Sequence, residues 1–292
     1  MDVADGVEFE AHRPLMFSIA YRMLGSVAEA EDIVQEAYLR YRATPPEQIE
    51  SHRAFLTTIV TRLCLNHLQS ARAQRETYIG PWLPEPVLTG SEGPFAPAQR
   101  AELHESLSMA FLVLLEQLTP LERAVFLLRE VFDYEYAEIA QITGRAEAAC
   151  RQIFSRAKKH IAAGRPRFRP SPEEHRQVLE RFIRAVNTGD LEGLMEVLAD
   201  EVVFVADGGG KNLDAARRPI RGSRAVARFL LFGPRRRHAY EVRVAEVNGE
   251  PALLLCEGDE PRIVVTIGVA NGRVSAIRAV GNPDKLRGVK WV

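Results

Sequence analysis

A stretch rich in proline and glycine, from about residue 73 to residue 97, divides this chain of 292 residues. It has no helical or strand periodicity, and it ends the helical pattern that precedes it. A second break, Pro166–Pro172, follows another helical region. Two such breaks in a chain long enough for two or three domains predict separate modules joined by linkers. The predicted segments are 1–75, a linker at 76–98, 99–168 and 172–292.

The segments on either side of the linker are predicted to be helical. Ser26 and Glu29 have the spacing of a capping box at the start of one apolar stripe, and Ser51 is a candidate N-cap for the next. After the linker, Thr119-Pro120-Leu121-Glu122 combines an N-cap, a proline at the first helical position and a glutamate that closes the box. Both segments are therefore expected to be all-α.

The segment Tyr134–Ile161 has the spacing of a helix-turn-helix, with Gly144 at the tight turn. The net charge of the chain is only −1, yet residues 145–169 contain eight Lys or Arg and one acid. Such local charge favours contact with phosphates, and the first residues of the second helix would face base edges. The alternative is a solvated basic face on a structural helix. Candidate DNA-contacting residues are Glu147, Arg151, Gln152, Ser155, Arg156, Lys158 and Lys159, the first three at base edges.

The region after the second break changes character. Two helical stripes are followed by runs of strand-like residues, and Asn271-Gly272 between the last two runs is a strong hairpin signal. This order predicts an α+β domain.

The two helical segments resemble the extracytoplasmic-function sigma factors. Residues 20–42, with the specific stretch AEDIVQEAY, and residues 52–69 resemble the domain that binds polymerase and reads the minus-ten element. The segment LTPLERAVFLLREVFDYEYAEIAQITG resembles the domain that reads the minus-thirty-five element. The resemblance implies that Asp32, Gln35 and Glu36 face the polymerase. It also implies that Thr58, Thr61, Arg62 and Asn66 lie near the melted promoter strand.

Three short motifs are similar to those of a sigma-factor subgroup with a C-terminal SnoaL-like extension. They are WLPEP at 82–86, DGGGK at 207–211 and NPDKL at 282–286. The implied fold is multidomain, with two all-α domains that bind DNA and polymerase and then an α+β SnoaL-like cone. The implied regulatory contacts are Trp82, Leu83, Asp207, Lys211, Asn282, Asp284 and Lys285.

Asp207 and Lys211 permit two interpretations. They could lie at the mouth of a pocket or against the helical domains, or Asp207 could cap the backbone of a tight glycine turn. No paired acid and base is evident, so we do not expect an enzyme. Three widely spaced cysteines indicate a reducing cytoplasm, and neither a metal-ligand spacing, a cofactor motif nor a membrane-length apolar run is present.

We therefore predict a cytoplasmic sigma factor that binds core RNA polymerase and promoter DNA and is regulated in cis by its C-terminal domain. That domain could hold an unidentified small ligand. Two alternatives stay open: a ligand-responsive helix-turn-helix regulator, and a cone-fold enzyme fused to a DNA-binding region. Copurification with polymerase distinguishes the first alternative, and turnover that depends on Asp207 would support the second.

Overall fold

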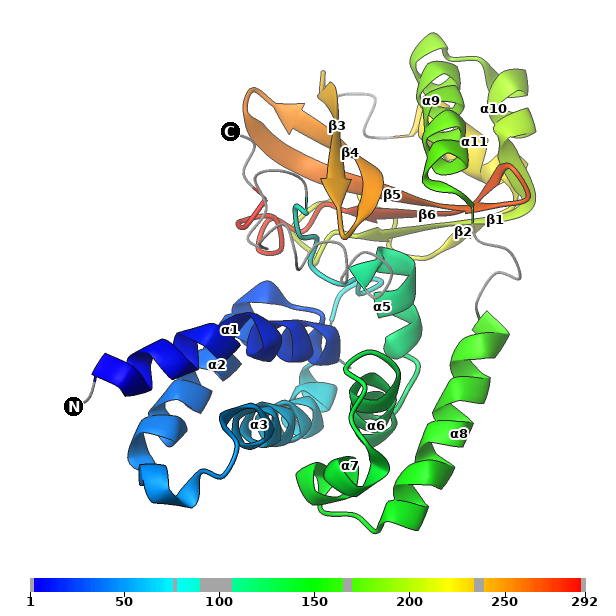
Figure 1. Cartoon of the computed structure of the whole chain (residues 1–292). Coiled ribbons are helices and arrows are strands. Elements are labelled where there is room, and N and C mark those ends of the chain that lie inside the picture. Colours follow the sequence, from blue (N-terminus) through cyan, green and yellow to red (C-terminus); the bar gives the residue numbers. More distant parts are fainter. Residues whose placement is uncertain (1–2, 76–77, 90–106, 165–169, 234–238, 290–292) are drawn as a thin grey trace. The chain divides into compact units, whose positions relative to one another are not determined.

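The computed structural model describes residues 3–75, 78–89, 107–164, 170–233 and 239–289. The chain forms two compact units (Figure 1). The helical unit contains Met1–Glu76 and Phe111–Arg165, and the C-terminal unit contains Thr77–Ala110 and Pro166–Val292. The two segments predicted as separate helical domains thus pack together, and the linker folds with the C-terminal domain.

The described residues 3–75 and 107–164 are mainly helical, as predicted. Its elements are α1 Val3–Leu24, α2 Val27–Ala43, the 3-10 turn η1 Pro46–Gln48, α3 His52–Arg75, α5 Met109–Leu115, α6 Pro120–Glu130, α7 Tyr136–Thr143 and α8 Glu147–Gly164.

Two predicted helix starts differ in detail. At α6 the capping box is complete: Glu122 N–H donates to the Thr119 hydroxyl (3.3 Å) and Thr119 N–H donates to the Glu122 carboxylate (3.1 Å). At α2 the Ser26 hydroxyl accepts from Glu29 N–H (3.3 Å). The Glu29 carboxylate lies 3.4 Å from Nε2 of His67 on α3.

The helix-turn-helix is formed by α7 and α8. Gly144 ends α7 with φ of 66°, a left-handed conformation that glycine adopts without the steric cost of a Cβ. Cys150 and Ile153 on α8 are buried with Val125 of α6 in one apolar cluster. This packing buries one side of α8 and leaves the opposite side to solvent.

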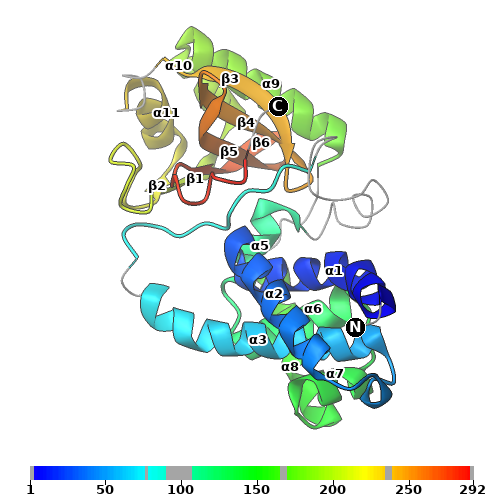
Figure 2. The same ribbon diagram turned by 90° about the vertical axis from the view of Figure 1, so that its left-hand side faces the viewer.

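The C-terminal unit is α+β, as predicted. Its sheet has the order β2-β1-β6-β5-β4-β3, in which only the β1–β6 pair is parallel. Helices α9, α10 and α11 pack their apolar sides on one face of this curved sheet (Figure 2). The elements are α9 Pro172–Thr188, α10 Leu191–Val197, β1 Leu198–Asp207, β2 Ile220–Arg221, α11 Ser223–Phe232, β3 Glu241–Val247, β4 Glu250–Glu257, β5 Glu260–Ala270 and β6 Arg273–Val280.

The predicted hairpin between β5 and β6 is present. Asn271 and Gly272 both have positive φ, at 52° and 69°, as a two-residue turn of type I′ requires. The order of β1 and β6 at the centre of the sheet places the ends of both strands, at Asp207 and Val280, side by side. The DGGGK and NPDKL motifs leave the sheet from these adjacent ends.

Candidate nucleic-acid interface and linker clamp

The candidate DNA-reading surface is the exposed side of α8. Because a helix repeats every 3.6 residues, burial of Cys150, Ile153 and Ala157 along one side of α8 leaves the opposite side exposed. Glu147 is half-buried at the N-terminus of the helix. The exposed candidates are Arg151, Gln152, Ser155, Arg156, Lys158 and Lys159.

Two of these cations already have partners within the helical unit. Arg151 pairs with Glu147 and lies 4.8 Å above the ring of Tyr136 on α7. Lys158 pairs with Glu130 of α6, with Nζ 2.9 Å from a carboxylate oxygen. All of these groups are on the surface, where ion pairs contribute little, so phosphates can compete for both cations.

The candidate polymerase-binding residues lie on α2. Asp32 and Gln35 are exposed, one turn apart. Glu36 is half-buried and pairs with Arg40 across one helical turn (3.0 Å). The three side chains are thus held on one helix, with two of them accessible to a partner.

The residues expected near a melted strand lie on α3 and differ in exposure. Asn66 is exposed, and Thr58 is half-buried with its hydroxyl donating to the carbonyl of Ala54 (2.8 Å). Thr61 is fully buried, at 0% exposure. In this conformation Thr61 therefore cannot contact DNA.

The cause is direct packing of α3 on α7 (Figure 2). The Arg62 guanidinium donates to the carbonyls of Gln141 and Ile142 at the end of α7, at 2.9 Å and 3.0 Å. One turn earlier, the hydroxyls of Thr57 and Tyr134 lie 2.7 Å apart. Side chains four residues apart share a helix face, so Thr61 lies on the face that Thr57 turns toward the helix-turn-helix.

Two arginines connect α1 with α6 and with the turn that follows α6. Arg123 of α6 donates to the carbonyl of Met23 (2.5 Å) at the end of α1. Arg22 is buried, lies 5.6 Å above the ring of Phe132, and donates to the Ser18 carbonyl (3.1 Å). Burial lowers the pKa of Arg22 to about 9. Of the α3 residues predicted to approach DNA, the packing of the helical unit therefore buries Thr61 and leaves Asn66 exposed.

In the C-terminal unit, Asp207 is the centre of a buried polar network. Its Oδ1 accepts from the Tyr78 hydroxyl (2.5 Å) and from Gly209 N–H (3.1 Å). Its Oδ2 accepts from Leu83 N–H (2.8 Å) and from Lys285 Nζ (2.7 Å). Four donors satisfy the carboxylate, so its full burial is compensated. Three of the four donors come from the linker or the C-terminal tail.

The tail completes the network from the other side. Lys285 Nζ also donates to the Leu83 carbonyl (2.5 Å) and lies 4.0 Å above the ring of Trp82. The Asn282 amide donates to the Tyr78 hydroxyl (2.9 Å). Burial and the bond to Asp207 raise the pKa of Tyr78, so its hydroxyl stays protonated and donates.

The linker also extends the edge of the sheet. Val87 N–H donates to the side-chain oxygen of Asn248 (3.1 Å), and the backbone N–H of Asn248 donates to the Val87 carbonyl (2.8 Å). Thr89 N–H donates to the Glu246 carbonyl (3.0 Å). We call the set of contacts that Asp207, Asn248, Asn282 and Lys285 make with linker residues 78–89 the linker clamp.

The glycines of DGGGK are explained by close approach. A Cβ on Gly208 would lie 2.6 Å from Ala215 Cβ, and one on Gly209 would lie 2.3 Å from the Asn282 amide nitrogen. A Cβ on Gly210 would lie 3.0 Å from the side chain of Ile79. Only glycine lets this loop touch the linker, the tail and its own continuation at once.

The network separates Asp207 from Lys211, the two residues that the sequence analysis considered together. Lys285 is the partner of Asp207, while Lys211 pairs on the surface with Asp284 (2.5 Å). Asp207 does cap a glycine turn through Gly209, and it does not line the cavity of the domain. Tyr78 and Asn248, which complete the network, were missed because neither belongs to a recognised motif.

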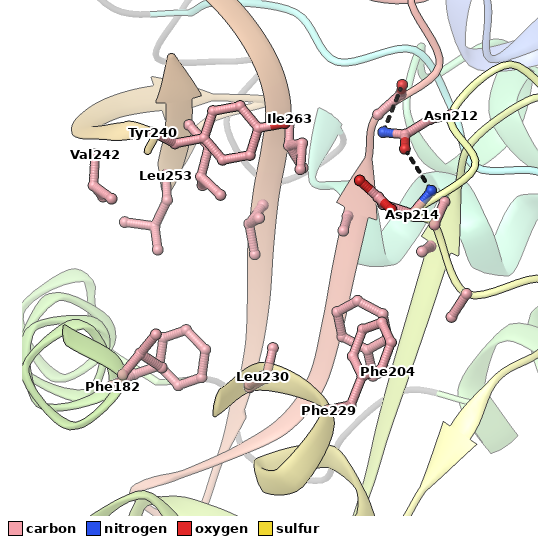
Figure 3. A pocket seen from close by; sticks show the side chains of 18 of the residues that line it. Phe182, Phe204, Asn212, Asp214, Phe229, Leu230, Tyr240, Val242, Leu253 and Ile263 are labelled. Carbon is pink, nitrogen blue, oxygen red and sulfur yellow. Dashed lines mark hydrogen bonds between the residues drawn. The ribbon is translucent and has the colours of Figure 1, made fainter. Parts of the chain in front are cut away.

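A separate cavity of about 140 Å³ opens between the helices and the concave face of the sheet (Figure 3). Apolar side chains such as Phe182, Leu253 and Val265 form most of its wall. Its polar lining comes from Asn187, Asn212, Asp214 and Tyr240. None of these four residues was predicted from the sequence as part of a site.

No helix in the described residues is long and apolar enough to cross a membrane. Within the same residues, no group of three or more His, Cys, Asp or Glu is placed to hold a metal ion.

Comparison with protein families divides the chain in the same order as the structure. Residues 9–74 match the model of Sigma-70 region 2, and residues 108–161 match Sigma-70, region 4. Residues 179–292 match the SnoaL-like domain. The α3 face and the α8 face thus fall in the two sigma regions, and the cavity falls in the third match.

The chain also matches relatives along almost its whole length. The ECF RNA polymerase sigma factor SigJ of Mycobacterium tuberculosis is 41% identical over 297 residues, covering 96% of this chain and 93% of SigJ. The probable ECF RNA polymerase sigma factor SigI of the same species is 32% identical over 286 residues, covering 95% and 93%. The crystal structure of M. tuberculosis SigJ matches with a TM-score of 0.77 and 38% identity, over 97% of this chain and 98% of that one.

Proposed function

Because this chain belongs to the ECF RNA polymerase sigma factors, which direct transcription initiation at promoters, we propose roles for its surfaces and a means of control in cis. The α8 side of the helical unit reads the minus-thirty-five element as duplex DNA. Arg151 and Gln152, near the start of the helix, meet base edges, and Lys158 and Lys159 meet phosphates. The observation that carries this assignment is the exposure of all four on one side of α8.

Residues of α2 and α3 contact core RNA polymerase and the melted promoter strand, respectively. Asp32, Gln35 and Glu36 bind core RNA polymerase. Thr58, Arg62 and Asn66 contact the melted minus-ten strand, as polar side chains contact unstacked bases. Thr61 joins them only when α7 moves away from α3, so the closed helical unit is a resting form that must open on the promoter.

Control in cis follows from the linker clamp. The linker joins α3 to the helix-turn-helix, and its residues 78–89 are held by Asp207, Asn248, Asn282 and Lys285. When the clamp holds the linker, it shortens the free chain between the two DNA-reading modules. The C-terminal unit thereby biases which separations of the two modules are reached.

Run-off transcription with core polymerase tests the proposal. The full chain is compared with residues 1–170, and with the full-chain variants Tyr78→Phe and Asn248→Ala, which loosen the clamp without changing the helical unit. Lys211→Met, in the exposed pair with Asp284, is the matched control. We expect promoter output to change with the truncation and both clamp variants but not with the control. Equal output from all five proteins would refute control in cis.

The alternatives receive less support. A helix-turn-helix regulator that acts without polymerase does not account for the match of residues 9–74 to Sigma-70 region 2. An enzyme that uses Asp207 does not fit a carboxylate saturated by Tyr78, Gly209, Leu83 and Lys285. We therefore propose a protein without catalytic activity of its own that works in the cytoplasm, where its polymerase and promoter are.

A further inference from the structure

The cavity of the C-terminal unit has the size and lining of a small-molecule site. Its volume is about 140 Å³, close to that of engineered cavities of roughly 150 Å³ that bind benzene. Phe182, Phe204 and Phe229 line it from α9, β1 and α11, and they present aromatic faces to its interior (Figure 3). One ring therefore fills the apolar part of the site.

Three of the four polar side chains of the cavity, those of Asn212, Asp214 and Tyr240, form what we call its polar end. Figure 3 shows Asn212 and Asp214 together on the loop after β1, with Asp214 N–H donating to the Asn212 side chain (3.1 Å). Tyr240 lies close enough for the Asp214 charge to help raise its pKa, although burial is the larger cause. A carboxyl group, a phenol and an amide beside an apolar wall select a ligand with one polar, hydrogen-bond-donating end.

We propose that this cavity binds a small molecule with one aromatic ring and an amine, and that its occupancy tightens the linker clamp. Asp214 accepts the amine, and the phenylalanines enclose the ring. Anions of the same size bind more weakly than the amine, because their charge meets the carboxyl group of Asp214. The regulatory half of this inference rests on the proposed control in cis.

The proposed coupling runs through the loop after β1, which contacts the cavity on one side and the linker on the other. Its cavity side carries Asn212, whose amide donates to the Gly281 carbonyl (3.4 Å), and both residues line the cavity. Its other side is Asp207, which binds the linker, and Gly281 N–H donates to the Asp207 carbonyl (2.8 Å). Asn282, the next residue, donates to Tyr78. The polar end of the cavity and the linker clamp are thus joined by hydrogen bonds between two neighbouring segments, the loop after β1 and the tail after β6.

The direction of the effect follows from linkage. Asn212 and Asp214 have the arrangement described above when the loop after β1 is in its clamped conformation. A ligand that fits this geometry binds the clamped state more tightly than a state in which the loop has moved, so it raises the clamped population. By reciprocity, a variant that weakens the clamp must weaken ligand binding by the same factor.

Binding is tested on the full chain with three probes of one size: benzylamine, toluene and benzoate. We expect benzylamine to bind with a Kd on the order of 1 mM or below and benzoate about tenfold more weakly. Asp214→Asn should cost about tenfold in benzylamine affinity and leave toluene affinity unchanged. If benzylamine does not bind, or binds no better than benzoate, the proposed ligand class is wrong.

Location is tested with a matched pair of substitutions. Val265→Phe places a ring inside the cavity, whereas Val244→Phe adds the same ring at an exposed position on β3, 55% accessible and not part of the lining. Val265→Phe should abolish benzylamine binding and Val244→Phe should not. Asp214→Asn, which changes no volume, covers the case in which Val265→Phe fails to fold. Equal binding by both phenylalanine variants would place the site elsewhere.

Coupling is tested by hydrogen exchange of linker residues 78–89, whose Leu83 and Val87 amides are held by the clamp. Saturating benzylamine should slow their exchange about fivefold or more, and Tyr78→Phe should lower benzylamine affinity. Bound ligand with unchanged exchange would eliminate the coupling. None of these measurements contains polymerase, so their failure leaves the transcription test of control in cis standing.

Discussion

The Arg62 guanidinium of α3 donates to the backbone carbonyl of Ile142, Nε to O 3.0 Å, at the end of the first helix of the helix-turn-helix. Arg62, which the sequence predicts to lie near single-stranded DNA, is thus bound in this structure to the backbone of the helix-turn-helix, for which we propose contact with duplex DNA. The contact with α7 and the proposed contact with the promoter compete for the same guanidinium. The first prediction concerns how easily the contact opens.

Tyr134→Phe should shift the helical unit toward its open form. It removes the 2.7 Å hydroxyl contact with Thr57 and leaves the side chains proposed to bind DNA unchanged. A buried hydrogen bond contributes about 1 kcal/mol, so the opening equilibrium should change about fivefold. Distance measurements between spin labels on α2 and α7 report it. Tyr38→Phe on α2, which packs on Phe9, is the control, and an equal shift in that variant would contradict the prediction.

Arg151→Ala and Lys158→Ala should affect DNA binding in different ways. Loss of Arg151 should cost about 1–3 kcal/mol on the cognate promoter and relax selectivity at one position. Loss of Lys158 should weaken binding to all sequences and reduce the salt dependence, because only a phosphate contact is lost. Titrations of holoenzyme with cognate and scrambled promoter at several salt concentrations separate the two. Identical losses on scrambled DNA would disprove the division of roles.

Lys285→Met should strongly destabilise the C-terminal unit. It leaves the fully buried Asp207 carboxylate without its cation, and breaking a buried pair from one side costs about 3–5 kcal/mol. Lys211→Met breaks the exposed pair with Asp284 and should cost about 0–1 kcal/mol. Denaturant unfolding followed by Trp82 fluorescence in a Trp291→Phe background measures both. Comparable losses would show that burial of the pair does not matter.

The C-terminal unit should lose stability in mild acid through His175 on α9. Burial lowers the pKa of this imidazole, so the unfolded chain takes up a proton more readily than the folded one. Stability should therefore decline as the pH falls below about 6.5 and continue to fall until the folded pKa is passed. Thermal unfolding over this range measures the decline. His175→Leu should flatten it, whereas His160→Leu, exposed on α8, should not.

Short-range signals in the sequence predicted local structure well. The capping box at Thr119, the left-handed Gly144 and the turn at Asn271-Gly272 depend on residues within a few positions of one another. The sequence also indicated that the motifs WLPEP, DGGGK and NPDKL belong to one set, and the structure brings the three together. What the sequence could not indicate is which atoms meet, because Tyr78 and Asp207 are 129 residues apart and Asn282 is 204 residues from Tyr78.

Burial of side chains where elements pack together was the other feature that could not be predicted from the sequence. Thr61 lies on a helix face that is polar at Thr57 and Thr61, and a polar face is ordinarily taken as solvent-exposed. Its burial depends on α7, whose approach is decided by tertiary packing and leaves no periodic pattern in α3. The cavity residues Asp214 and Tyr240 were missed for a related reason, since a loop and a strand start converge there only after the sheet has curved.

The pairing of linker residues 87–89 with residues 246–248 has a consequence for dosage. A regulator supplied as a second polypeptide acts by mass action, so its hold on a partner weakens as both are diluted. Here the two pairing segments belong to one molecule, and the fraction of clamped molecules is set by an effective concentration that the chain itself fixes. A cell that contains ten copies of the protein and a cell that contains a thousand would therefore have the same fraction of clamped molecules.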